Sequence, residues 1–293
     1  MIQNLIREGI VSEVIPEHHS CRVTFPDRNN LVSAELPVLA IGAFGNCGYA
    51  LPDIDDRVVV LMCSNSINGH EGFIIGSLYT SESLPDEANA DLTKLTFKDE
   101  TQIRYKRSTD DDKESEFKIK FNDDAAISYK NDEENHEFKT TFNDETELLY
   151  KNTEDDHEFS LKFNDDAKFS YTNDEDNHEF KTTFNDSAEI SYTNGEESHV
   201  FKMKFSDGTE ILYETGEEDS TFHIKFTDGC EISYEFGEEA TFSMKFSDGS
   251  TIEHTDDGLT LDIQGGIDIT AGDEINITTG ADVNIKGSNI NLN

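Results

Sequence analysis

The chain has 293 residues, of which 34% are hydrophobic, and its 63 acidic and 23 basic residues give a formal net charge of −40. This charge predicts repulsion from nucleic acid and from anionic membranes, so we expect no nucleic-acid partner. The four cysteines lack the spacing of a disulfide framework or a zinc motif, and residues 1–8 lack the apolar core of a signal peptide. We therefore expect synthesis in a reducing cytosol. High charge can also indicate disorder, an alternative opposed by the strict aromatic periodicity described below.

Residues 1–80 contain short apolar runs separated by turn signals, and all five prolines of the chain lie at or before Pro85. The runs cover residues 9–15, 21–25, 31–41, 57–62 and 72–79. Five short strands in so few residues predict a small closed barrel, and the five-stranded oligonucleotide/oligosaccharide-binding (OB) fold is the leading candidate.

Four segments of this region carry a more specific likeness: Gly9–Val14, Cys21–Arg28, Leu51–Leu61 and Gly72–Tyr79. In their order and spacing, residues 5–80 resemble the phage baseplate assembly protein V family, the central spikes of contractile phage tails and R-type bacteriocins. The resemblance implies a homotrimer with an N-terminal barrel docked on the baseplate hub protein and a β-helical needle. It also implies a location in the virion or bacteriocin particle, at the tail baseplate, after assembly in the bacterial cytoplasm.

Residues 81–92 are polar and are expected to form a linker, after which residues 93–257 repeat a 21-residue pattern. Within each copy, apolar and charged residues alternate, which predicts strands with one apolar and one polar face. Gly208, Gly229 and Gly249 stand at tight turns where a positive φ is expected. Each copy is therefore predicted to be strand–turn–strand–turn, and the whole region an antiparallel meander.

No helical segment is available to cover the apolar face of this meander, so the face must meet copies of itself. Three copies around an axis would form a triangular β-prism with a phenylalanine and tyrosine core. On the polar face, lysines are expected to pair across strands with Glu147, Glu189, Glu210 or Glu231. These lysines are Lys118, Lys120, Lys202, Lys204, Lys225 and Lys245.

From residue 258 the period shortens to about eight residues and aliphatic residues replace the aromatic ones. Residues 258–293 resemble the narrow triple-stranded β-helix that forms the needle tip of spike families. The final histidine is His254, so the terminus lacks a metal-binding pair and its open strand edges are expected to hold a separate tip protein. The expected trimer core of prism and tip comprises Phe117, Phe121, Ile127, Tyr129, Phe138, Phe142, Phe159, Phe163, Phe180, Phe184, Phe201, Phe205, Ile211, Tyr213, Phe222, Phe226, Phe242, Phe246, Ile267, Ile275 and Val283.

Two sets of polar residues are candidates for ion binding. His136, His157, His178 and His199 recur two residues before a core phenylalanine and are candidate ligands of a transition metal shared by three copies. The favoured alternative is that they cap the edge of the aromatic core. The acidic turns match no calcium loop and are better explained as solvated turns that discourage aggregation.

No Ser/His/Asp or Cys/His constellation and no phosphate-binding glycine loop stands out, so we expect no catalytic residues and no cofactor. Together with these patterns, the resemblance to baseplate spike proteins implies a non-enzymatic homotrimeric central spike of a contractile injection machine, a rigid rod that punctures the target cell envelope. The alternative is a trimeric receptor-binding tail fibre or stalk. An enzymatic rival, a cell-wall hydrolase, has little support from the sequence.

Overall fold

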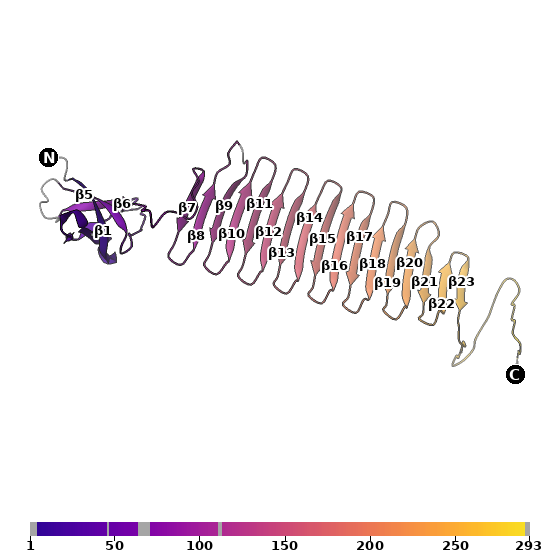
Figure 1. Cartoon of the computed structure of the whole chain (residues 1–293). Helices are drawn as coiled ribbons and strands as arrows, with labels where there is room; N and C mark the ends of the chain where they lie inside the picture. Colours follow the sequence, from indigo (N-terminus) through magenta and orange to yellow (C-terminus); the bar gives the residue numbers. More distant parts are fainter. Residues whose placement is uncertain (1–4, 46, 64–70, 111–112, 291–293) are drawn as a thin grey trace. The chain divides into compact units, whose positions relative to one another are not determined.

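The computed structural model describes residues 5–45, 47–63, 71–110 and 113–290, and it is an all-β structure with large antiparallel sheets (Figure 1). The chain divides into two compact units, Met1–Ala90 and Asp91–Asn293. The division falls inside the segment expected as a linker. Helical structure in the described residues is confined to the short 3-10 turns η1 (Pro16–His18) and η2 (Pro26–Arg28), and no helix there is long and apolar enough to cross a membrane.

The first unit contains six short strands. They are β1 (Ile6–Ile15), β2 (Ser20–Phe25), β3 (Leu31–Val32), β4 (Leu36–Pro37), β5 (Arg57–Met62) and β6 (Gly72–Ser77). β1 lies between β2 and β5, β2 also pairs with β3 and β4, and β5 pairs with β6. Just after β4, Val38 forms a parallel bridge with Ile74 of β6. The contacts therefore form a continuous circuit in the order β1, β2, β4, β6, β5.

The prediction of one strand over residues 31–41 was wrong, because this segment forms two short strands separated by residues 33–35. The backbone N–H of Ser33 donates to the carbonyl of Val23 at 2.8 Å. In return, the N–H of Val23 donates to the side-chain oxygen of Ser33 at 2.9 Å, where a regular ladder would use a carbonyl. A side chain that replaces a backbone acceptor interrupts the ladder.

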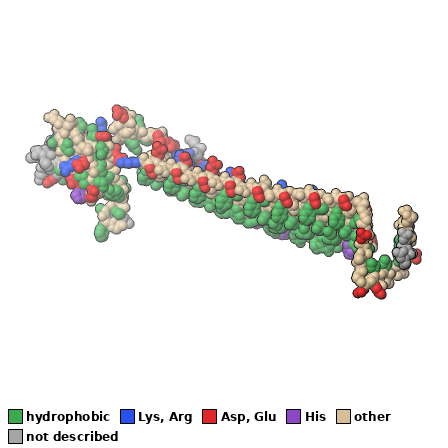
Figure 2. All heavy atoms as spheres, turned by 90° about the horizontal axis from the view of Figure 1, so that it is seen from below, with side chains coloured by type: hydrophobic (Ala, Val, Ile, Leu, Met, Phe, Trp, Pro, Cys, Tyr) green, Lys and Arg blue, Asp and Glu red, His purple; other side chains and the backbone are tan. Residues whose placement is uncertain are grey.

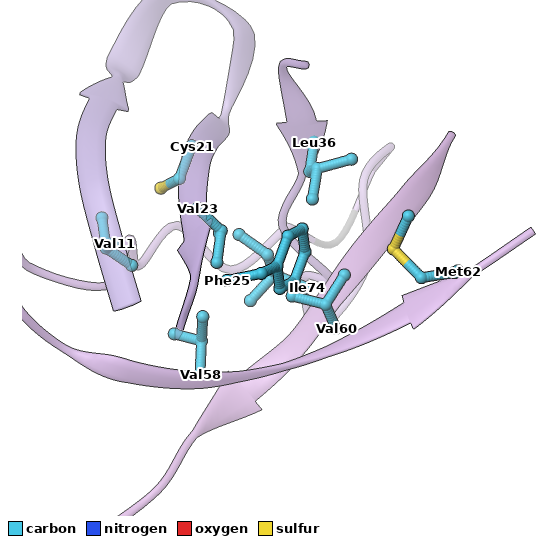
Figure 3. Packing of buried hydrophobic residues seen from close by; sticks show 9 residues of the cluster. All are labelled: Val11, Cys21, Val23, Phe25, Leu36, Val58, Val60, Met62 and Ile74. Atoms are coloured by element: carbon cyan, nitrogen blue, oxygen red, sulfur yellow. The ribbon is translucent and has the colours of Figure 1, made fainter. Parts of the chain in front are cut away.

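The core of the first unit is small and mostly aliphatic, with Phe25 as its one aromatic member (Figure 3). It consists of Val11, Cys21, Val23, Phe25, Leu36, Val58, Val60, Met62 and Ile74. Gly9 is required where β1 crosses β2, because a Cβ there would lie 2.2 Å from Cγ1 of Val23. Burial raises the pKa of the Cys21 thiol, which therefore stays protonated and packs as a small apolar group.

The second unit is a meander in which each strand pairs with the next one along the chain, as the repeat predicted. β7 and β23 lie at opposite ends of this row of strands (Figure 1). The strands are β7 (Leu92–Thr96), β8 (Gln102–Lys106), β9 (Ser115–Lys120), β10 (Ala126–Asn131), β11 (His136–Thr141), β12 (Glu147–Asn152), β13 (His157–Lys162), β14 (Lys168–Asn173), β15 (Asn177–Thr183), β16 (Glu189–Gly195), β17 (His199–Lys204), β18 (Glu210–Thr215), β19 (Ser220–Lys225), β20 (Glu231–Phe236), β21 (Thr241–Lys245), β22 (Thr251–Thr255) and β23 (Gly258–Asp262).

The sequence pattern predicts a break in register over residues 104–112 and an end of the meander at residue 257, and the structure differs at both places. The longer connection between β8 and β9 does not disturb the register, since Tyr105 still pairs with Phe117. At the other end, the meander does not stop at residue 257, because β23 continues it through Asp262 and pairs with β22. Residues 263–290 form no strand in the structure, whereas the sequence predicted narrow tip strands over residues 258–293.

The tight turns share one geometry along the whole meander. In the first full copy, the N–H of Phe121 donates to the carbonyl of Ala125 at 2.8 Å, and the N–H of Asp124 donates back to Phe121 at 3.3 Å. Gly208, Gly229 and Gly249 have φ of 89°, 85° and 87°, which confirms the predicted positive φ. The same turn position has φ between 65° and 68° in residues that are not glycine, which was not predicted: Asp124, Glu145, Asp166 and Ser187.

These turns lead to a matched pair of substitutions. Gly229→Ala should lower the stability of the full-length protein by about 1–2 kcal/mol, because a Cβ is strained at positive φ even though no atom lies within 4 Å of it. Ser187→Gly, at the equivalent position, relieves that strain and should cause no loss. Thermal unfolding followed by circular dichroism measures both, and an equal loss in the two variants would contradict the turn geometry.

Candidate functional site: the aromatic face

One face of the second unit is organised in rows that run across the strands. The register pairs Phe201 directly with Tyr192 on one side and Tyr213 on the other, and the same alternation continues along the sheet. This Phe/Tyr row contains Tyr105, Phe117, Tyr129, Phe138, Tyr150, Phe159, Tyr171, Phe180, Tyr192, Phe201, Tyr213, Phe222, Tyr234 and Phe242. We call the surface that carries this row the aromatic face.

A second, mostly aliphatic row lies beside the Phe/Tyr row. It includes the expected core residues Ile127 and Ile211, which pair with Ile119 and Met203. Several members were not among the predicted core residues, although their alternation with charged neighbours could have identified them: Ile119, Leu148, Leu161, Phe169, Ile190, Met203, Ile224, Ile232, Met244 and Ile252. Phe169 fills its place with edge-to-face contacts to Phe159 and Phe180, at ring distances of 6.1 and 5.2 Å.

The two edges of the aromatic face differ in composition. At the tight turns lies a third row, the turn phenylalanine row, made of Phe121, Phe142, Phe163, Phe184, Phe205, Phe226 and Phe246. At the long turns, cross-strand pairing alternates asparagine with histidine in a fourth row. This histidine row contains Asn131, His136, Asn152, His157, Asn173, His178, Asn194 and His199.

The aromatic face is uncovered in the single chain, and Figure 2 shows it as a continuous hydrophobic surface along the second unit. Many phenylalanines and tyrosines of the rows keep 38–49% of their surface exposed, whereas the buried hydrophobic residues of the described chain all belong to the first unit. An apolar surface this long and uninterrupted is typical of an assembly interface. The expected tip residues Ile267, Ile275 and Val283 are about half exposed and pack in no strand.

The opposite face is polar and carries paired charges. Two of the predicted ion pairs are present, Lys202–Glu210 at 3.1 Å and Lys245–Glu231 at 3.7 Å. Glu147 and Glu189 pair with other lysines than expected, Lys139 at 2.6 Å and Lys181 at 2.9 Å. Lys120 pairs within its own turn, with Asp124 at 3.0 Å. Each exposed pair contributes at most about 1 kcal/mol, so this face is suited to solvent contact.

The four repeat histidines lie on the aromatic face, at its long-turn edge. Nδ1 of His136, His178 and His199 lies 3.1 Å from the hydroxyl oxygen of a tyrosine in the preceding strand. Successive histidines are two strands, or about 10 Å, apart. In the part of the chain that the structure describes, no three His, Cys, Asp or Glu residues gather as a metal site would require.

The acidic turns use their carboxylates to organise the backbone. Oδ1 of Asp132 accepts from the N–H groups of Glu134 and Asn135 in a long turn, and the pKa of Asp132 is lowered mainly by the bond from Glu134. In the tight turns, Oδ1 of Asp144 accepts from the N–H of Thr146 at 3.0 Å, and this bond lowers the pKa of Asp144. Carboxylates that accept these bonds close turns, which is the geometry of an Asx turn.

Comparison with known proteins gives little further information. No family model and no curated protein matches the chain. Among solved structures, the wild-type TCP10 domain of CPAP from Danio rerio aligns with 59% of this chain and 100% of its own chain, at 15% identity and a TM-score of 0.26. A likeness at this level carries no argument about what this chain does.

The turn carboxylates lead to a pH prediction. The folded pKa of Asp144 is lowered, so its hydrogen bond stabilises the fold above the unfolded pKa of about 3.9, and that contribution is lost as the pH falls through the folded value. Asp144→Asn keeps an acceptor but does not titrate. The stability of wild type relative to Asp144→Asn should therefore be constant from pH 7 to 5 and decline below about pH 4.

Denaturant titrations at each pH measure this difference. Asp155→Asn, in a long turn, is the matched control for the loss of one charge. Acid also relieves the repulsion between the many carboxylates, so the difference between variants is informative and the absolute stability is not. A difference that stays constant down to pH 2 would contradict the assigned role of Asp144.

Proposed function

We propose that three copies of this chain assemble with their aromatic faces inward, as a triangular β-prism. With strands about 4.8 Å apart, the rows from β7 to β23 extend for about 75 Å, and strands of six residues are about 20 Å wide. Each copy thus offers roughly 1,500 Å² of one face, about twice the area that each partner contributes to a standard interface. Burying this surface supplies the stabilisation that the single layer lacks.

The width of the sheet favours three copies. The centre of an equilateral triangle with sides of about 20 Å lies about 6 Å from each side, and a side-chain layer is about 5 Å thick, half the usual sheet-to-sheet distance. One layer of side chains from each of three sheets therefore fills the interior. Four sheets would enclose a channel. Two sheets would also pack well, so the mass of the assembly separates two copies from three.

In such a prism the histidine rows lie at the three corners. Equivalent histidines of the three copies are then about 15–20 Å apart, much too far to bind one metal ion through bonds of about 2 Å. The geometry therefore supports the alternative in which these histidines cap the edge of the aromatic core.

We further propose that the first unit is an OB-fold barrel that docks on a baseplate hub protein. The proposal is supported by the pairing circuit β1, β2, β4, β6, β5, in which a parallel bridge between Val38 and Ile74 joins the end of β4 to β6, and β5 pairs with β1. The nine-residue core that this circuit encloses allows the unit to fold by itself. The likeness of residues 5–80 to baseplate spike proteins supports the hub as its partner.

Combining the two units, we propose that the protein is the non-enzymatic central spike of a contractile injection machine, a phage tail or an R-type bacteriocin. The observation that carries the proposal is the aromatic face, whose Phe/Tyr row continues without interruption from β8 to β21. Three such faces packed together form a stiff shaft that can transmit the force of sheath contraction to the target cell envelope. A receptor-binding fibre or stalk is the alternative, and such a fibre would require a broad binding head.

The trimer itself is tested by mass and by one pair of variants. Light scattering should give about 99 kDa, three times 33.0 kDa. Phe201→Asp should abolish the trimer, because it places three carboxylates inside the core. Lys202→Ser, one residue away on the polar face, should leave it intact, since Ser160 and Ser243 occupy the same repeat position in other copies. A 66 kDa particle, or equal effects of the two variants, would overturn the prism.

The spike function is tested by docking. A fragment ending at Ala90 should bind the hub protein encoded with this chain and compete with full-length protein for incorporation into particles. A fragment of residues 91–293 is the control and should not bind. Capture of the hub by residues 91–293 alone would reverse the roles of the two units and favour the fibre.

The sequence predicts that the C-terminus binds a separate tip protein. This binding site lies partly outside the described residues, since residues 291–293 are not described. The same docking experiment can test it. Full-length trimer should retain a small neighbouring tail protein that a variant lacking residues 288–293 does not retain. Retention by both proteins would contradict a tip protein at this end.

A further inference from the structure

The aromatic face has one apolar and one polar edge. The tight-turn edge carries the turn phenylalanines, each paired across its turn with a small residue such as Ala125 or Thr146, and Phe142 and Phe184 there are 49% and 45% exposed. The long-turn edge carries the alternating asparagines and histidines of the histidine row. Every chain therefore brings one edge of each kind to the assembly.

Three such chains cannot be joined by like edges alone. A ring of three has three corners, which join three tight-turn edges and three long-turn edges, so pairing like with like leaves one edge of each kind over. Rotation of identical subunits about one axis instead makes every contact heterologous, with unlike surfaces meeting. We propose that each corner joins the turn phenylalanine row of one copy to the histidine row of the next copy, an inference that rests on the proposed trimer.

The chemistry of the histidine row fits this contact. The Tyr129 and His136 rings lie 6.5 Å apart at 30°, and the Tyr192 and His199 rings lie 6.4 Å apart at 26°. The bond between the tyrosine hydroxyl and Nδ1 at 3.1 Å satisfies one polar atom of each ring while leaving flat aromatic surface at the edge. Phenylalanine rings from a neighbouring copy pack well against such surface. The contact covers the exposed turn phenylalanines.

Tight and long turns alternate along the sheet, and this alternation determines which turns of neighbouring copies lie at the same height along the prism. The tight turn after β17 and the long turn after β18 are one strand spacing apart, about 4.8 Å along the sheet. In an in-register trimer, Ser206 of one copy therefore lies near Glu217 of the next copy. Glu217 stands between Thr215 and Ser220, which continue the long-turn edge beyond the last member of the histidine row, His199. Asp155 lies in the long turn after β12, five strand spacings or about 24 Å from the level of Ser206.

Cysteine cross-linking tests this corner in the full-length trimer. All variants are made in a protein whose accessible cysteines are removed by Cys47→Ser, Cys63→Ser and Cys230→Thr. Threonine is chosen at position 230 because Thr146 and Thr209 occupy the same repeat position. Cys21 is buried and is kept. With a short bis-maleimide, Ser206→Cys/Glu217→Cys should give covalent trimers on a denaturing gel, because each chain is linked to two neighbours. The variants Ser206→Cys and Glu217→Cys alone should give no cross-link, since equivalent turns lie at different corners.

The control pair Ser206→Cys/Asp155→Cys separates a specific corner from random collision and should give no more than a tenth of the covalent trimer. Equal trimer yield from this pair, or covalent dimers from either single variant, would overturn the proposal. Light scattering on the same samples distinguishes failure of the corner contact from failure of the proposed trimer. A trimeric mass without cross-linked trimer overturns the corner alone, whereas a monomeric or dimeric mass overturns the proposed assembly.

Discussion

Hydrogen bonding between consecutive strands is the interaction on which the second unit depends. Each inner strand from β8 to β22 is held by the strands before and after it, so the backbone is satisfied within one layer. A single layer cannot, however, bury its own side chains. The buried hydrophobic residues in the described chain all belong to the first unit. The stability of the meander must therefore come from a surface outside the sheet, and the proposed assembly follows from that need.

The 21-residue period keeps this surface continuous. Because side chains alternate between the two faces of a strand, a register shift of one residue would move every aromatic side chain to the polar face. The chain tolerates length changes only in its turns. The connection from β8 to β9 is longer than the others, and Phe242 follows Phe222 by 20 residues, yet Tyr105 still pairs with Phe117 and Tyr234 with Phe242. Both changes leave the rows unbroken.

Charge has a separate role from packing. Many aspartates and glutamates lie in the turns, where Asp132 and Asp144 accept backbone hydrogen bonds. The lysines lie on the polar face beside glutamates. The aromatic face carries few charged side chains, so three copies can approach there without burying them. The net charge of −40 per chain opposes further lateral association of the proposed trimers. Both properties suit the proposed shaft.

Local periodicity determined much of this protein from sequence alone. The two-residue alternation in Phe201–Phe205 identified the strands and their faces, and Gly208, Gly229 and Gly249 identified the tight turns. Other features required the tertiary structure, because they depend on which strands become neighbours. Pairing brings asparagine beside histidine along one edge, Ser33 interrupts a strand by bonding Val23, and β23 extends the meander past Gly258. Spacing along the chain predicts on which face of the sheet a side chain lies. Only the register of the paired strands determines which residue of the next strand is its neighbour.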